Sequence, residues 1–160
     1  MTATAILHGP TDQFLAAAVS AAGFTLNDTP PATLLINLTG DPADTIAAAE
    51  QFAKTAADED SLVVSILHPH ASDDWPAARD AAIIWAFTRH AALAWAPRRI
   101  RVNAIGLGVS PILSTQPPEA SGQPAVPAPA APATPGDIAA TIIAMWGFPS
   151  MTGQLIRLGA

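Results

Sequence analysis

The sequence predicts a Rossmann-like α/β fold, a three-layer α/β/α sandwich with a mostly parallel sheet. Short apolar runs typical of buried strands alternate with longer runs of helical periodicity. The strand runs are continuously apolar, which is expected where helices cover both faces of a sheet. Since 160 residues suffice for one core of this kind, we expect a single domain over residues 1–160.

Each expected element is a compact segment. About five strands are predicted, at Thr4–His8, Thr33–Leu38, Leu62–Leu67, Ile100–Ile105 and Gln154–Leu158. Helices are predicted at Asp12–Ala22, Asp44–Ala57, Trp75–Ala96 and from Thr134 to about Met145. Residues 111–134 are rich in proline and alanine without periodicity, which predicts a loop.

Composition excludes several classes of function. A net charge of −6 and only seven basic residues argue against a nucleic-acid partner. The chain has no cysteine, so thiol chemistry and cysteine-ligated metals are excluded. No apolar run approaches the roughly 18 residues of a membrane span, so we expect no membrane partner and a cytoplasmic protein.

The helix that ends near residue 96 is apolar almost all round, although a helix on a sheet needs only one apolar stripe. A charged fraction of 12% is also low for a free surface. Both observations predict contact with another subunit. The expected interface residues are Ile84, Trp85, Thr88, Trp95, Trp146 and Gln154; the alternative is that the tryptophans are simply half exposed.

Histidines lie where predicted strands end. The carboxyl ends of parallel strands share one edge of the sheet, the usual ligand crevice. We therefore expect a candidate small-molecule or cofactor site there, formed by His8, Gly9, Asn37, Gly40, His68, His70, Gly106 and Gly108. Metal binding by the imidazoles and local hydrogen bonding are the alternatives, and no metal ligands are assigned. Arg98, Arg99 and Arg101 are expected to cap the preceding helix, with anion binding as the alternative.

Two segments resemble the short-chain dehydrogenase/reductase family. Thr88–Gly108 (TRHAALAWAPRRIRVNAIGLG) is similar to the family's helix-to-strand passage ending in R-V-N-x-I-x-P-G, with Leu107 in place of the usual proline. Thr134–Leu158 (TPGDIAATIIAMWGFPSMTGQLIRL) resembles the family's C-terminal helix followed by a T-G-Q strand. Weaker similarities lie at Asn37–Gly40 and Leu62–Leu67. The resemblance implies a Rossmann-type fold and an ancestral NAD(P)-dependent oxidoreductase activity.

The chain departs from this family in its nucleotide-binding half. Of the glycine-rich turn after the first strand only Gly9 remains, because Gln13 and Leu15 stand at the later glycine positions. About ten residues separate Gly23 from the next long strand, where the family has further elements. The sequence therefore predicts a fold shortened in its nucleotide-binding half, and a protein without a cofactor, NAD and NADP included.

The family's proton-transfer residues have no counterpart either. The chain contains no tyrosine. Counting without gaps places Ala77 and Ala81 at the family's tyrosine and lysine positions, and a two-residue shift places Trp75 and Arg79 there. The serine position falls near His68, so we expect no catalytic residues and loss of the parental activity.

These patterns predict a non-catalytic protein that acts as an oligomerising structural or regulatory subunit. Its partner would be a second copy of the chain or a full-length, active member of the family. The alternative is a small-molecule-binding or cofactor-binding protein, or an altered enzyme, that uses the crevice at the carboxyl ends of the strands, at His8, His68 and His70. The sequence assigns no substrate, pathway or stoichiometry.

Overall fold

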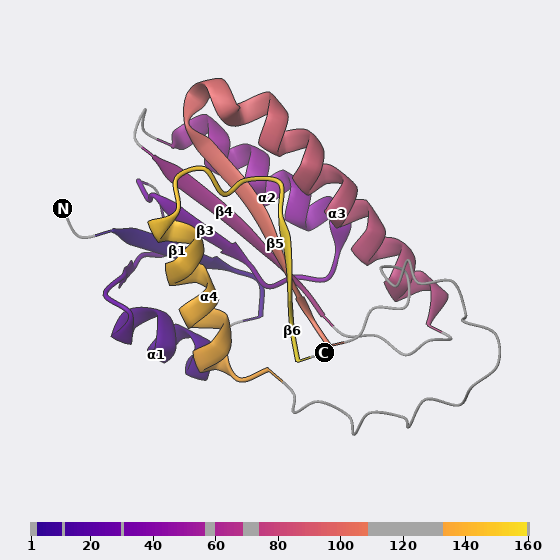
Figure 1. Cartoon of the computed structure of the whole chain (residues 1–160), viewed down its shortest axis with the longest axis horizontal. Helices are drawn as coiled ribbons and strands as arrows, with labels where there is room; N and C mark the ends of the chain where they lie inside the picture. The colour runs from indigo at the N-terminus through magenta and orange to yellow at the C-terminus, as the bar shows by residue number, and fades with distance from the viewer. Residues whose placement is uncertain are drawn as a thin grey trace.

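The computed structural model describes residues 3–10, 12–29, 31–56, 60–68, 74–108 and 133–159. Strands and helices alternate along the chain, as predicted (Figure 1). In order they are β1 (Thr4–His8), α1 (Gln13–Ala21), β2 (Thr25–Leu26), β3 (Leu34–Asn37), α2 (Pro42–Thr55), β4 (Ser61–Leu67), α3 (Trp75–Trp95), the short 3-10 helix η1 (Ala96–Arg98), β5 (Ile100–Leu107), α4 (Pro135–Gly147) and β6 (Leu155–Leu158).

The six strands form one parallel sheet in the order β2-β1-β3-β4-β5-β6. This confirms the predicted fold class, with one strand more than expected. The prediction missed β2 because two residues are too few to show a hydrophobic period. The direction of strand order changes between β1 and β3, and ligands of open α/β sheets bind beyond the strand ends at such a point.

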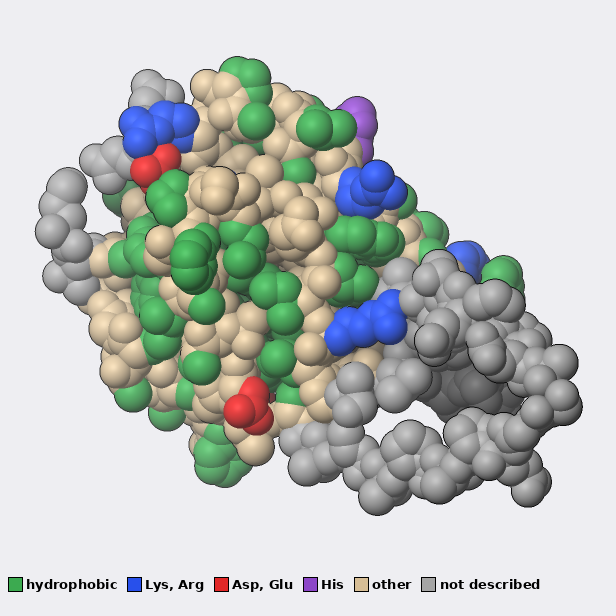
Figure 2. All heavy atoms as spheres, in the orientation of Figure 1, with side chains coloured by type: hydrophobic (Ala, Val, Ile, Leu, Met, Phe, Trp, Pro, Cys, Tyr) green, Lys and Arg blue, Asp and Glu red, His purple; other side chains and the backbone are tan. Residues whose placement is uncertain are grey.

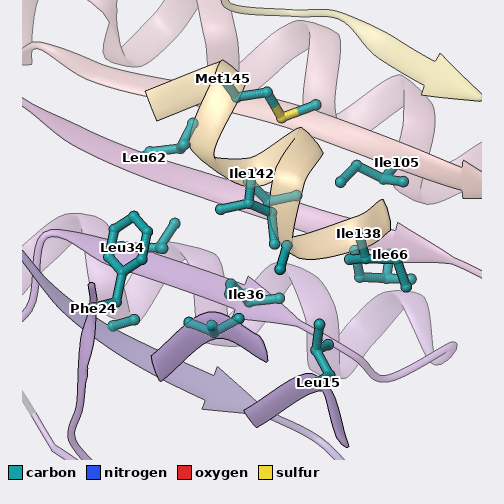
Figure 3. Packing of buried hydrophobic residues seen from close by; sticks show 14 of the residues in the cluster. Leu15, Phe24, Leu34, Ile36, Leu62, Ile66, Ile105, Ile138, Ile142 and Met145 are labelled. Carbon is teal, nitrogen blue, oxygen red and sulfur yellow. The ribbon is translucent and has the colours of Figure 1, made fainter. Parts of the chain in front are cut away.

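Two pairs of helices cover the sheet. Helices α1 and α4 pack together on one face, and α2 and α3 pack together on the other (Figure 1). Side chains alternate along β3, so Leu34 and Ile36 face the first pair while Leu35 faces the second. Figure 3 shows Ile138, Ile142 and other apolar side chains filling the space beneath α1 and α4.

Side-chain caps set where the longer helices begin. Asp41 accepts a 2.8 Å hydrogen bond from the N–H of Asp44, so α2 begins at Pro42 and not at Asp44 as predicted. Thr134 and Asp137 form a reciprocal capping box at the start of α4. Asp12 and Asp74 cap α1 and α3 as Asp41 caps α2, with a side-chain carboxylate that accepts from backbone N–H groups.

No helix among the described residues is long and apolar enough to cross a bilayer. The predicted loop at 111–134 lies outside the described residues, apart from its last two. A single domain over residues 1–160 stays a prediction.

Candidate functional site

The carboxyl edge of the sheet brings several predicted site residues together. His8 at the end of β1 is in register with Asn37 at the end of β3, and Asn37 is in register with Ser65 of β4. His68 follows β4 directly. His70 lies outside the described residues. The predicted convergence at this edge therefore holds for the residues that the structure describes.

His8 is held by a residue that the sequence analysis did not single out. Its Nε2 lies 3.1 Å from Oδ2 of Asp44, in the first turn of α2. Both side chains are partly exposed, so the pair contributes little to stability. Asp44 stands near the helix start, where a carboxylate interacts favourably with the helix dipole. His8 is thereby engaged within the subunit.

The hydrogen bond of His68 determines which of its ring nitrogens donates and which accepts. Nε2 of His68 lies 2.7 Å from the carbonyl oxygen of Leu38. Because a carbonyl only accepts, Nε2 must carry the proton and donate. In the neutral ring, Nδ1 is then an acceptor. His68 therefore offers an acceptor at the edge of the sheet.

Three buried polar atoms near this edge have no hydrogen-bond partner among the described residues. One is Nε2 of His8, whose contact with Asp44 is an ion pair only when the ring is protonated; the other two belong to Asn37 and Ser65. Nδ2 of Asn37 donates to the carbonyl oxygen of Thr45 at 3.5 Å, which leaves Oδ1 as the unpaired end of its amide. Oγ of Ser65, on the neighbouring strand, is also unpaired. Both residues are buried. Buried polar atoms without partners are uncommon and point to a water or ligand that the chain itself does not supply.

Gly9 is required by the backbone. Its φ is +113°, and a Cβ at this position would lie 2.8 Å from the backbone nitrogen of Thr39. Gly40, by contrast, has open space around the position of a Cβ. Gly9 thus lets the turn after β1 pass close to the end of β3, a role that needs no ligand. Gly106 pairs with Leu67 inside the sheet, and Gly108 donates to the carbonyl of Leu158 at 2.8 Å.

A cleft of about 580 Å³ opens at this edge on the α1 and α4 side. We call it the edge cleft. Its walls are mainly apolar, and its polar side chains are Asp12 and His68. It is lined by Pro10, Asp12, Leu15, Leu38, Gly40, Ile66, His68, Leu107, Ala133, Pro135 and Ile138.

A smaller hollow of about 140 Å³ lies on the α3 side of the same edge. We call it the α3 notch. It shares Gly40, Ile66 and His68 with the edge cleft and adds Leu67, Ala77, Asp80, Ala81 and Ile84. Sequence analysis missed Asp80, although its spacing from Ala77 and Ile84 places all three on one helical face.

The two alignments with the family's tyrosine and lysine positions, which the sequence left open, place their residues differently relative to the α3 notch. Ala77 and Ala81 line the notch. Trp75 is mostly exposed, and Arg79 forms a 2.8 Å ion pair with Asp80. Of the two alignments, only the one without gaps places both of its residues in the wall of a hollow.

Two of the six predicted interface residues lie inside the subunit. Ile84 and Thr88 are 1% and 0% exposed, and Thr88 donates from Oγ1 to the carbonyl of Ile84. Neither offers a surface to a partner. On the same helix Ile83 and Leu93 face solvent, with 41% and 81% exposure. The sequence predicts two apolar faces on this helix, but Ile84 and Thr88, which it assigns to the interface, lie on the face that is buried in the subunit.

The three predicted interface tryptophans are distributed differently. Trp85 is half-buried against the cluster around Leu67 and Ala104. Trp95 packs edge to face on Phe87, with 5.8 Å between ring centroids. Trp146 packs the same way on Phe24 at 5.6 Å and lies 5.8 Å from the guanidinium of Arg101. Gln154 is exposed, and its side chain donates to the carbonyl of Thr152.

The arginine cluster binds the protein's own carbonyls and carboxylates. Arg98 donates to the carbonyl of Ala53 in the last turn of α2, and Arg99 forms a bidentate pair with Asp60. Buried Arg101 donates to three carbonyls at the end of α4, those of Met145, Trp146 and Phe148. Arg99 caps the preceding 3-10 helix η1 through its backbone N–H, which donates to the carbonyl of Ala96, whereas the side chains of Arg98 and Arg101 bind the ends of α2 and α4 and not that of α3. Burial lowers the pKa of Arg101, and attraction to Asp60 raises it in part.

The described residues contain no group of three potential metal-ligating His, Asp or Glu side chains. His8 and His68 each have a partner within the chain. His70, the third imidazole of the metal alternative, lies outside the described residues, so this alternative gains no support.

No family model matches the chain, and no curated protein sequence matches it. Solved structures do match. A short-chain dehydrogenase/reductase of Serratia marcescens has a TM-score of 0.68 and 12% identity, with 99% of this chain and 96% of that chain covered. The FolM alternative dihydrofolate reductase 1 of Brucella suis, in complex with NADP, has a TM-score of 0.69 and 19% identity, with 99% and 94% covered.

A Brucella ovis oxidoreductase of the short-chain dehydrogenase/reductase family, in complex with a partially ordered NAD, covers 99% of this chain and 100% of its own. Its TM-score is 0.65 and its identity is 15%. The expectation that the chain takes no cofactor is therefore contradicted. The missing glycines and the short segment after Gly23 did not justify it, because proteins of this same fold hold NAD or NADP.

The edge cleft tests how a dinucleotide would fit. It lies at the N-terminus of α1 and beyond the ends of β1 and β3, where folds of this type bind the pyrophosphate. In the structure, Asp12 accepts hydrogen bonds from the N–H groups of Phe14 and Leu15. Those groups become available to a phosphate only if Asp12 turns away. In its sheet, its helices and the position of this cleft, the chain has the fold of the short-chain dehydrogenases/reductases.

Proposed function

We propose that the protein is a non-catalytic subunit with a short-chain dehydrogenase/reductase fold that works by association, with a second copy or with a full-length enzyme of that fold. The absence of the family's proton-transfer pair supports the first half of this proposal. The chain has no tyrosine, and the α3 notch is lined by alanines at the two positions concerned. Alanine transfers no proton, so the carbonyl chemistry of that family has no acid here.

The observation that carries association is the outer face of α3. Ile83 and Leu93 are exposed, and exposed Ala86 follows Ile83 by about one turn. Arg89 and His90 lie between Ala86 and Leu93 on the same surface. Exposed apolar side chains that share one helix face favour an interaction surface, and this one has two polar side chains within it. We call this face the α3 stripe.

A second apolar surface lies across the sheet. Figure 2 shows the face that carries α1, α4 and β6, where apolar side chains are widespread and charged ones are sparse. Ile143 and Phe148 are exposed on it. A subunit of a larger assembly would use either surface, so the experiment has to separate them.

The test is native mass spectrometry of the whole chain with sedimentation velocity at micromolar concentration. We expect a dimer or larger assembly, and we expect Leu93→Glu to weaken association at least about tenfold, because a charge buried in an apolar interface is costly. Ala17→Glu introduces the same charge on exposed α1, on the other side of the sheet, and is the matched control.

Association would be ruled out by two results together. The wild-type chain would remain monomeric at high concentration, and no full-length dehydrogenase would co-purify with it in fixed ratio from its native source. Dissociation caused by Ile143→Glu, with Leu93→Glu silent, would keep the association but move it to the α4 face. These two results are distinct because only the second leaves an assembly to measure.

Ligand binding at the carboxyl edge is the second candidate function. It is favoured by the edge cleft and by the polar groups that converge beside it, His68 among them. A ligand at free concentration L that binds the folded but not the unfolded chain stabilises it by RT ln(1 + L/Kd), so the melting temperature rises with the logarithm of ligand concentration above Kd. We expect such a ligand to lose its effect when His68→Leu removes the ring at the shared wall of both hollows.

A further inference from the structure

We propose that the α3 notch binds a small primary amine, as its ammonium ion, with a short apolar body. This deepens the second candidate function, ligand binding at the carboxyl edge, and is independent of association. It concerns the hollow on the α3 side of the sheet, which is distinct from the edge cleft on the α1 and α4 side.

The size and walls of the notch fix the body of the ligand. Its volume is about 140 Å³, and an apolar cavity of about 150 Å³ is large enough for benzene. Ile66, Leu67 and Ile84 supply most of the apolar surface, and Ala77 and Ala81 leave the space open. A single ring or a short branched chain therefore fits.

The polar groups of the notch fix the head of the ligand, because both accept. His68 donates through Nε2 to Leu38, which leaves Nδ1 as acceptor in the neutral ring. The Asp80 carboxylate receives two hydrogen bonds from Arg79, both on Oδ1, which leaves Oδ2 for another donor. A group that enters the notch has to donate.

Two buried polar atoms without a partner lie behind the notch. Ser65 lies two residues before Leu67 on the same side of β4, and Asn37 is its neighbour in register. Oδ1 of Asn37 is a buried acceptor without a donor, and Oγ of Ser65, which can donate or accept, has no partner among the described residues. An ordered water between an ammonium in the notch and these atoms would pair with them.

The charged residues around the notch also favour a cationic ligand. The chain has seven basic residues, all of them within the described ranges, and none lines the notch. Arg79 touches Asp80 from the exposed side of the helix, with 60% of its side chain exposed. An anionic head would therefore meet a carboxylate and no cation, whereas an ammonium meets a carboxylate and an imidazole lone pair.

Benzylamine, benzyl alcohol and benzoate test this inference, since they share one ring and differ in charge. Titration of the ¹⁵N-labelled full chain, followed by two-dimensional NMR, should show benzylamine perturbing residues around Ala77–Ile84, with a Kd at least about tenfold below that of benzoate. Asp80→Asn should weaken benzylamine about fivefold and leave benzyl alcohol unchanged.

Ala81→Leu should abolish binding of all three by filling the notch. Ala94→Leu, on an exposed position of the same helix, is the control for folding and should bind as the parent does. If benzoate binds as tightly as benzylamine, or if Asp80→Asn affects all three probes equally, the inference is overturned while ligand binding at the edge stands. If no probe perturbs the notch, both the inference and the notch as a binding site fail, and the edge cleft remains to be tested.

Discussion

Two regions of the sheet, β5 and the ends of β3 and β4, treat buried polar side chains differently. Near the amino end of β5, Arg101 joins this strand to the last turn of α4 through its terminal nitrogens, although its Nε has no partner among the described residues. At mid-strand, Asn103 donates to the carbonyl of Met151 and accepts from the N–H of Gln154, so both ends of its amide are used. At the carboxyl edge, Asn37 and Ser65 are equally buried and leave polar atoms unpaired.

This difference separates structural polar groups from functional candidates. A buried polar group whose partners belong to the chain fixes one arrangement of the elements it joins. A buried polar group without partners contributes no such link and raises the energy of the folded state unless water or a ligand pairs with it. The paired polar groups of β5 therefore help to hold the fold together, and the carboxyl edge has polar groups left for a water or a ligand.

Replacement of Arg101 should have the largest effect. Arg101→Met would leave three carbonyls of the α4 end without their donor, and we expect the free energy of unfolding to fall by about 4 kcal/mol. Urea denaturation measures this. Arg101→Lys keeps the charge but not the fork of donors, so it should recover only part of the loss. A loss below about 1 kcal/mol for Arg101→Met would show that water satisfies these carbonyls and that the amino end is not the rigid one.

Gly9 is the one point of the carboxyl edge that we expect to be as intolerant as the amino end. Gly9→Ala should lower the free energy of unfolding by about 3 kcal/mol, because a Cβ meets the Thr39 backbone and φ is positive. Gly40→Ala, close by, should change it by less than about 0.5 kcal/mol. Thermal unfolding of the two variants compares them directly. Equal effects would mean that this edge yields to an added methyl group.

Asn103 and Ser65 compare a paired with an unpaired buried side chain at nearly the same level of the sheet. Asn103→Ala removes two hydrogen bonds of a buried side chain and leaves their backbone partners unpaired, so we expect a loss of about 2 kcal/mol in the free energy of unfolding. Ser65→Ala removes a hydroxyl that has no partner among the described residues, so its effect should be near zero or stabilising. Chemical denaturation of both variants is the measurement. A large loss for Ser65→Ala would show that an ordered water already satisfies this site.

Most of the fold could be predicted because the hydrophobic periods of strands and helices can be recognised within short stretches of sequence. The predicted bounds of β1, Thr4–His8, match the structure to the residue, since the short apolar run Ala5–Leu7 is closed by Gly9-Pro10, which favours a turn. What failed depended on partners distant in sequence. The targets of Arg98 and Arg101 lie more than forty residues away, and no local pattern shows which helix end they reach.

The candidate site was predictable only in part, for the same reason. Parallel strands bring their ends to one edge, so the meeting of His8 with Asn37 followed from topology. The buried face of α3 did not follow, because Ile83 and Ile84 have the same hydrophobicity and only packing decides which of them faces the sheet. Loss of a cofactor was inferred from missing glycines, and structures of the same fold holding NAD and NADP contradict it.

The smallest expected effect concerns a polar group that has its partners but is exposed. Asp137 accepts from the N–H and the hydroxyl of Thr134 at the start of α4, and these hydrogen bonds hold its pKa below the usual value. Because the folded-state pKa is lowered, the stabilisation is present above the unfolded pKa of about 3.9 and is lost as the pH falls through the folded value. Asp137→Asn should therefore reduce stability slightly at pH 6 and make no difference at pH 2, as measured by thermal unfolding at each pH. Asp28→Asn, which removes an exposed carboxylate with no capping role, should not reproduce this dependence. If it does, the acid sensitivity belongs to the net charge of the chain and not to the α4 cap, and the contrast between satisfied and unsatisfied polar groups would then hold only for buried positions.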